Sequence, residues 1–258
     1  TDDGRILFVL PYFGRTLVGT TDTPCEPEDA YKPSDKEKAY LLNHLKRWFP
    51  QIEHPVIKSS WAGGRPLIKP TQGVIRSSRV VREHEVETLP CGLISAMGGK
   101  WTTCRTIAID TLKALESHLQ QKLPEPSNLP LIGSTESNSL TQSLLSNQKH
   151  TLKKFLPDTP LQEMQITHLQ GNYGLKAIDI IKDKPLAKIE PLSNVIPLCK
   201  AEIEHAIKNE HACTSTDVLA RRCRLAMVDY EEAQRIVPLV QEQLNHAGLT
   251  QSDINLEH

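Results

Sequence analysis

A glycine pair followed by a lysine is the feature of this sequence with the clearest chemical potential. Gly98 and Gly99 end an apolar run, and Lys100 and Thr102 follow just before the amphipathic pattern of a helix. Glycines let a backbone adopt positive φ and approach a ligand closely, while the first amides of a helix present unpaired donors and partial positive charge. Lys100 would add a full charge and Thr102 a hydroxyl group. The pattern predicts a site for an anion or an electron-rich ring edge, although a tight turn alone is also typical of this spacing.

Arginines are concentrated upstream of the glycine pair. Arg65 follows two glycines and precedes a proline, and this setting fixes the backbone from which its guanidinium group projects. Arginine binds carboxylate or phosphate through two parallel hydrogen bonds, so Arg65 and the later Arg82 are candidates for such contacts. Arg76 and Arg79 lie between them, and pairing with neighbouring glutamates is the simpler interpretation for these two.

Two further groups of polar residues give weaker signals. His84 could accept a proton, but a histidine in a strand more often has a structural role. Thr20, Thr21 and Asp22 follow a β-rich run and place hydroxyl groups and a carboxylate at one turn. Taken alone, this cluster indicates an Asx or threonine turn rather than a site.

The composition is typical of a globular protein without a polyanionic partner. Among 258 residues, 30 basic side chains balance 31 acidic ones, which predicts no binding of nucleic acid. No apolar run reaches the roughly 18 residues of a membrane span, and the chain does not open with a signal peptide. Integral membrane insertion is therefore not expected, whereas peripheral membrane contact stays open.

The six cysteines are far apart and form neither a CxxC motif nor a zinc-binding spacing with histidines. This pattern predicts no metal site, no disulfide framework and reduced thiols in a cytoplasmic setting. The chain begins with Thr1 rather than methionine, and residues 256–258 resemble the start of a polyhistidine tag. We therefore expect a fragment of a longer protein that carries a tag remnant.

The elements that must position the polar residues begin as strands. An apolar run at residues 6–10 and a β-rich run at residues 16–21 predict a hairpin that turns at Gly14-Arg15. Residues 93–97 should form a compact buried strand directly before the glycines. Further extended segments are expected at residues 56–61, 73–77 and 85–89.

Helices follow from apolar residues at helical spacing. Residues 35–49 should form a helix capped by Ser34, and residues 103–119 a second one after the glycines. Residues 122–139 are rich in Pro, Ser, Asn and Gly and are typical of a linker. Beyond this linker the pattern predicts a helical bundle, with helices over residues 140–155, 161–169, 174–182, 197–209, 215–227 and 230–246.

Four separated motifs occur in the order and approximate spacing of the FAD-dependent glycerol-3-phosphate dehydrogenases. They are GRILFVLPYFGRTLVGTTDTP at residues 4–24, WAGGRPL at 61–67, REH at 82–84 followed by GLISAMGGKWTTCR at 92–105, and AEIEHAIKNEHACTSTDVLARRCRLAMVD at 201–229. The chain resembles the C-terminal half of that family. The glycine fingerprint of the family's dinucleotide-binding turn is absent from these residues.

The resemblance implies an α+β protein with a glycine-oxidase-like fold. Residues 1–91 would belong to a substrate domain built on a mixed or antiparallel sheet, and residues 92–122 would supply the final strand, the glycine loop and the final helix of the FAD domain. Residues 123–139 would be the linker, and residues 140–250 an all-α C-terminal domain.

The resemblance also implies an activity: oxidation of sn-glycerol 3-phosphate at C2 to dihydroxyacetone phosphate, with hydride passing to FAD and electrons to a membrane quinone. Gly98, Gly99, Lys100 and Thr102 would then lie along the flavin ring. Arg65 and Arg82 would hold the phosphate and polarise the C2 oxygen. Lys100 would contact either flavin or substrate, and Thr21 and His84 would line the cleft or support it.

Three functional hypotheses follow. The first is a quinone-reducing dehydrogenase attached peripherally to the cytoplasmic membrane, the second an oxygen-using glycerophosphate oxidase, and the third a non-catalytic docking or dimerisation module. As an isolated fragment, the chain is expected to hold FAD poorly and to be inactive, because the phosphate-binding half is missing. A homodimer is possible. Arg221 and Arg222 could contact a membrane or partner, but pairing with Asp217 and Glu210 is the simpler interpretation.

Overall fold

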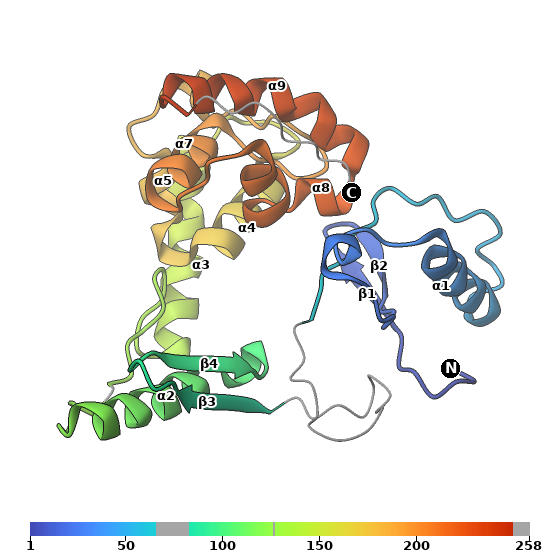
Figure 1. Ribbon diagram of the computed structural model, residues 1–258. Helices are drawn as coiled ribbons and strands as arrows, with labels where there is room; N and C mark the ends of the chain where they lie inside the picture. Colours follow the sequence, from blue (N-terminus) through green and yellow to red (C-terminus); the bar gives the residue numbers. More distant parts are fainter. Residues whose placement is uncertain (66–82, 126, 250–258) are drawn as a thin grey trace. The chain divides into compact units, whose positions relative to one another are not determined.

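The computed structural model describes residues 1–65, 83–125 and 127–249 (Figure 1). The described chain forms two compact units. The large unit comprises residues 1–20, 32–62 and those from 129 onward, and the small unit comprises residues 21–31 and 63–128. Several expectations lie outside the described residues, namely the strand at 73–77, the side chains Arg76, Arg79 and Arg82, and the tag remnant.

The large unit begins with an antiparallel hairpin. Strand β1 (Phe8–Tyr12) pairs with β2 (Arg15–Gly19), and the last pair of the ladder joins Tyr12 to Arg15. The turn therefore consists of Phe13 and Gly14, whose φ angles of 46° and 73° suit the left-handed turns that close two-residue hairpins. The prediction of a turn at Gly14-Arg15 was wrong by one residue, because Arg15 belongs to the ladder.

Helix α1 (Asp35–Trp48) has the cap that its sequence predicts and ends one residue before the expected position. The hydroxyl of Ser34 accepts a hydrogen bond from the amide of Glu37, and the Glu37 carboxylate accepts one from the amide of Ser34 at 2.9 Å. This reciprocal capping box satisfies two amides that the helix leaves without partners. Residues 56–61, by contrast, form no strand within the described part of the chain.

The C-terminal part of the large unit is all helical, and the chain as a whole is α+β, as expected. The elements are α3 (Asn138–Phe155), α4 (Gln162–Tyr173), η4 (Gly174–Lys176), α5 (Ala177–Ile181), α6 (Leu186–Ile189), α7 (Lys200–Asn209), the π-helix η5 (Asp217–Arg222), α8 (Leu225–Val228) and α9 (Tyr230–His246). We refer to this part as the helical region.

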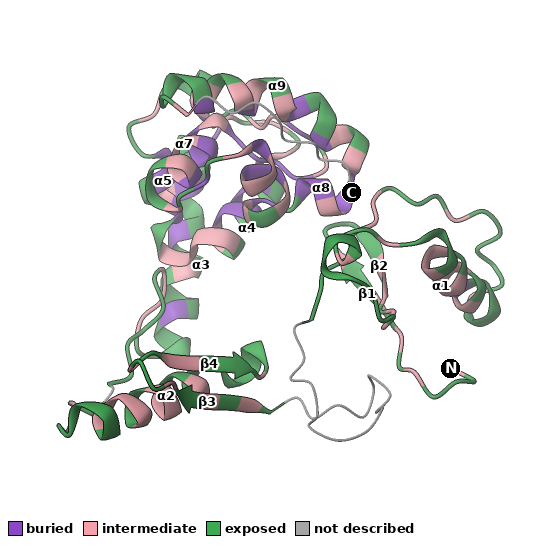
Figure 2. Ribbon diagram, viewed as in Figure 1, coloured by how far each residue is buried: buried purple, intermediate pink, exposed green. Residues whose placement is uncertain are grey.

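The helical region contains nearly all of the buried apolar side chains (Figure 2). Apart from Leu45 of α1, every buried apolar residue of the described chain lies between residues 152 and 244. One cluster joins α7, α8 and α9 through residues such as Ile203, Leu225 and Ile236, and a second joins α3, α4 and α5 around Leu152. The helical region therefore has a hydrophobic core of its own.

The single helix expected over residues 215–227 is interrupted. A π-type hydrogen bond runs from the amide of Cys223 to the carbonyl of Val218, and Arg224 has a left-handed φ of 65° before α8 begins. The interruption redirects the chain so that Leu225 and Val228 point into the core. Arg221 pairs with Asp217, and Arg222 lies 3.6 Å from the carboxylate of Glu210, which confirms the simpler interpretation of both arginines.

The small unit contains a second hairpin covered by a helix. Strand β3 (His84–Thr88) pairs antiparallel with β4 (Ile94–Gly98), and α2 (Cys104–Leu119) packs against both strands. The 3-10 turn η3 (Trp101–Thr103) leads into α2. The strand expected over residues 93–97 is present one residue later, but the expectation that it is buried was wrong, because this described sheet has two strands and β4 has no residue that is fully buried.

A close approach between two glycine backbones fixes the start of the helical region. A Cβ atom added to Gly133 would collide with the carbonyl oxygen of Tyr173, and one added to Gly174 would collide with the carbonyl oxygen of Gly133; φ at Gly133 is 86°. We expect Gly133→Ala to lower the free energy of unfolding by about 2 kcal/mol or more, because backbone must move and the left-handed conformation disfavours a side chain. Urea denaturation followed by circular dichroism measures this change.

Gly171→Ala is the matched control, since nothing lies within 4 Å of a Cβ added there. Gly171 is inside α4, where alanine favours the helix by up to about 1 kcal/mol. A Gly133→Ala protein as stable as Gly171→Ala would contradict the close approach.

Candidate functional site

The predicted glycine site is a tight loop between β4 and α2. Gly98 and Gly99 have φ angles of 71° and 83°, which are left-handed values that favour glycine. A Cβ atom on Gly99 would lie 2.6 Å from Cδ1 of Ile107 and 3.1 Å from Cβ of His84. The backbone therefore passes between β3 and α2 in a space that admits no side chain.

The helix end that follows the loop has no side-chain cap. Neither Lys100 nor Thr103, the residues at the two N-cap positions, accepts a hydrogen bond from a helix amide with its side chain. The Thr103 hydroxyl instead donates to the carbonyl of Lys100 at 3.0 Å. Lys100, Trp101 and Thr102 are exposed, and Trp101 retains 88% of its accessible surface. The amides of Thr103 and Cys104 bond the carbonyls of Lys100 and Trp101, so the amides of Trp101 and Thr102 are the donors that this turn can offer to an anionic group, next to an exposed lysine in the chain.

His84 lies beside this loop, opposite Gly98 in the β3–β4 ladder. Its Nε2 atom is 3.0 Å from a carboxylate oxygen of Asp110 on α2, and Lys113 binds the other oxygen at 2.9 Å. Lys113 and His84 lower the pKa of Asp110 below its usual value. Because an ionised carboxylate only accepts hydrogen bonds, Nε2 carries the proton towards Asp110, and Nδ1 has no hydrogen-bond partner among the residues that the structure describes.

Arg65 and Thr21 belong to the same small unit. Arg65 is exposed and forms no ion pair with any described carboxylate, whereas Thr21 is half-buried. The backbone before Arg65 is closely packed, since a Cβ atom on Gly64 would lie 2.9 Å from Cβ of Ala30. The backbone at Gly64, directly before Arg65, therefore has little steric freedom. Arg82, the other predicted substrate arginine, lies outside the described residues.

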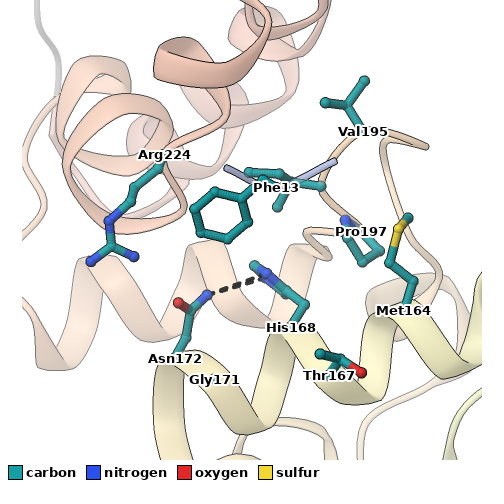
Figure 3. A pocket seen from close by; sticks show the side chains of 10 residues that line it. Phe13, Met164, Thr167, His168, Gly171, Asn172, Val195, Pro197 and Arg224 are labelled. Carbon is teal, nitrogen blue, oxygen red and sulfur yellow. Dashed lines mark hydrogen bonds between the residues drawn. The ribbon is translucent and has the colours of Figure 1, made fainter. Parts of the chain in front are cut away.

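The large unit contains a pocket that the sequence patterns do not predict (Figure 3). This mainly apolar pocket has a volume of about 220 Å³. His168 lines the pocket. Its Nδ1 atom lies 3.3 Å from the side-chain nitrogen of Asn172, and its Nε2 atom lies 2.7 Å from the buried carboxylate of Glu202. The only sequence signal was the spacing of His168 and Asn172 on one helical face. The lining residues are Phe13, Met164, Thr167, His168, Gly171, Asn172, Val195, Ile196, Pro197 and Arg224.

Other kinds of site are not indicated by the described residues. No group of three or more histidine, cysteine, aspartate or glutamate side chains is arranged to bind a metal ion in that part of the chain. Among the helices described, none combines the length and the apolar composition needed to cross a membrane.

The glycine loop offers a direct test of its steric requirement. We expect Gly99→Ala to destabilise the small unit by about 1–2 kcal/mol, because alanine in a left-handed conformation is strained and its methyl group collides with Ile107. Hydrogen exchange at the amides of β3 and β4 measures the loss. Gly63→Ala, where nothing lies within 4 Å, is the control, and equal exchange in both variants would contradict the prediction.

Two family models match consecutive parts of the chain. Residues 1–105 match the FAD dependent oxidoreductase family, and residues 125–248 match the C-terminal domain of alpha-glycerophosphate oxidase. The glycine loop and Arg65 lie in the first match, and the helical region lies in the second.

Curated relatives and a solved structure extend the comparison. The chain is 32% identical over 253 residues to the probable mitochondrial glycerol-3-phosphate dehydrogenase of Dictyostelium discoideum, covering 93% of this chain and 38% of that protein. It is 30% identical to the human mitochondrial glycerol-3-phosphate dehydrogenase, covering 94% and 33% respectively. It therefore spans between a third and two fifths of the length of these relatives.

The fold matches that of the glycerol-3-phosphate dehydrogenase from Bacillus halodurans, which was crystallised with FAD. The TM-score is 0.75 at 21% identity, and the match covers 97% of this chain and 49% of the other. At this identity the match shows that the chain shares the fold of about half of that protein.

Proposed function

We propose that the full-length protein oxidises sn-glycerol 3-phosphate at C2 to dihydroxyacetone phosphate with FAD as its cofactor. The observation that carries the proposal is the β4–α2 loop, where two left-handed glycines meet an uncapped helix end and a lysine. The names of the relatives supply the substrate.

The glycine loop fits the edge of a flavin. Gly98 and Gly99 leave the loop without side chains that would shield its backbone, and the first amides of η3 can donate to the polar edge of a flat ring that lies along it. Gly98, Gly99, Lys100 and Thr102 would hold the cofactor, and bound FAD would supply a hydride acceptor. The positive charge of Lys100 and the helix end stabilises negative charge at this edge.

The substrate phosphate is assigned to Arg65 and Arg82. A guanidinium group binds a phosphate through two parallel hydrogen bonds, and the backbone directly before Arg65 is held where Gly64 packs closely against Ala30. Thr21 would line the same cleft. His84, oriented by Asp110, has Nδ1 available and would accept the proton of the C2 hydroxyl.

Two versions of this function differ in the molecule that accepts electrons from the flavin. We favour a membrane quinone, reached through peripheral contact with the cytoplasmic membrane, because the relatives are dehydrogenases. The match of residues 125–248 to a domain named after alpha-glycerophosphate oxidase supports oxygen as the alternative acceptor. Oxygen consumption with release of peroxide, without an added quinone, would favour the oxidase.

The test is an anaerobic absorbance spectrum of the full-length protein before and after addition of glycerol 3-phosphate. Bleaching of the flavin band is the expected result. A protein that holds flavin but is not bleached would overturn the proposed substrate. A colourless full-length protein would instead contradict the assignment of the glycine loop to FAD.

A further inference from the structure

A buried carboxylate of the helical region holds two segments from the N-terminal part of the large unit. Asp229, whose side chain is 7% exposed, accepts a hydrogen bond from the Arg15 guanidinium of β2 at 3.0 Å. The same oxygen lies 3.8 Å from the ammonium group of Lys58. The second carboxylate oxygen accepts from the amide of Glu232 and caps α9. One side chain thus joins β2, residue 58 and the start of α9.

The segment around Lys58 is held by further contacts with the same helices. The carbonyl of Lys58 accepts a hydrogen bond from the amide of Tyr230 at 3.0 Å, and the Ser59 hydroxyl donates to the carbonyl of Ala226 at 2.6 Å. The ring of Trp61 lies 6.2 Å from that of Tyr12, which packs against the helical core. Residues 58–61 are therefore anchored although they form no strand.

Both anchored segments lead directly into the proposed substrate site. Strand β2 ends at Gly19, two residues before Thr21, and residues 58–61 continue through two glycines to Arg65. Thr21 and Arg65 follow the anchored residues by a few positions in the chain, so the anchor limits how far each can lie from Gly19 or Trp61. The Gly64–Ala30 approach restricts the second segment further.

We propose that Asp229 is a positioning residue for substrate binding, which fixes through Arg15 and Lys58 the two segments that carry Thr21 and Arg65. This inference rests on the proposed function. The helical region then contributes to the substrate site without supplying a residue that contacts the substrate, and its capping carboxylate couples the two.

Asp229→Asn in the full-length holoenzyme separates positioning from capping, because asparagine caps a helix as well as aspartate but carries no charge for Arg15 or Lys58. We expect hydrogen exchange at residues 15–19 and 58–61 to rise about tenfold, and KM for glycerol 3-phosphate to rise about tenfold, with kcat changed less and flavin content unchanged. Arg15→Gln should reproduce the effect, and the double variant should show less than the sum of the two.

Asp217→Asn is the matched control, since its partners Arg221 and Cys213 belong to the helical region and it should leave exchange and KM unchanged. Unchanged exchange in Asp229→Asn would overturn the anchor. Faster exchange with an unchanged KM would overturn the positioning role. If the unaltered holoenzyme does not react with glycerol 3-phosphate, both the proposed function and the positioning role fail. Hydrogen exchange in Asp229→Asn still decides whether Asp229 holds residues 15–19 and 58–61.

Discussion

Arg65→Ala is expected to lower kcat/KM for glycerol 3-phosphate about a thousandfold in the full-length protein, without loss of flavin. The side chain would form a charge-assisted, bidentate contact with a phosphate that carries up to two negative charges, and truncation of one partner of such a pair costs roughly 2–5 kcal/mol. Each 1.36 kcal/mol corresponds to about tenfold in rate. Steady-state kinetics with an artificial electron acceptor measures the ratio, and the flavin spectrum confirms that the cofactor is retained.

Two variants make this result specific. Arg65→Lys should recover only part of the activity, because an ammonium group keeps the charge but cannot form two parallel hydrogen bonds. Arg221→Ala, which removes an exposed arginine paired with Asp217 in the helical region, should leave the kinetics unchanged. Normal kinetics in Arg65→Ala would assign the phosphate to other residues and would remove the main role that we propose for the WAGGRP segment.

Elements that depend on neighbouring residues were predictable from the sequence. The boundaries of α9 agree with the expectation over residues 230–246, and α1 agrees to one residue at its end. Both helices combine an apolar face with an N-cap, and these determinants lie within a few residues of each other. The same locality explains why the glycine loop could be recognised, since Gly98 to Thr102 are consecutive in the chain.

Features that depend on distant residues were not predictable. The helix expected over residues 215–227 is broken at Arg224 because Leu225 and Val228 pack into the core beyond it. Strand β4 is exposed because its described sheet has only two strands. The anchor at Asp229 joins residues that are far apart in sequence, as does the pair of His168 and Glu202. Periodicity and capping patterns contain no information about such contacts, because tertiary packing decides them.

Glu202→Ala is expected to have the largest effect on stability within the helical region. The Glu202 side chain is 1% exposed, and one oxygen lies 2.7 Å from Nε2 of His168 while the other accepts from the amide of Cys199 at 3.0 Å. Burial and the neighbouring Glu202 carboxylate raise the pKa of Tyr173 well above its usual range. Removal of the carboxylate would leave His168 and the Cys199 amide without an acceptor.

Loss of one partner from a buried, hydrogen-bonded pair costs about 3–5 kcal/mol, which is a large share of the stability of a typical domain. Glu202→Gln keeps an oxygen for His168 and should cost clearly less, about 1–2 kcal/mol. Urea denaturation of the chain, followed at 222 nm, measures both. Glu163→Ala is the control, because Glu163 is about half exposed and pairs only on the surface with Lys149 and Lys153. A midpoint for Glu202→Ala equal to that of Glu163→Ala would show that the buried network does not hold α4 to α7.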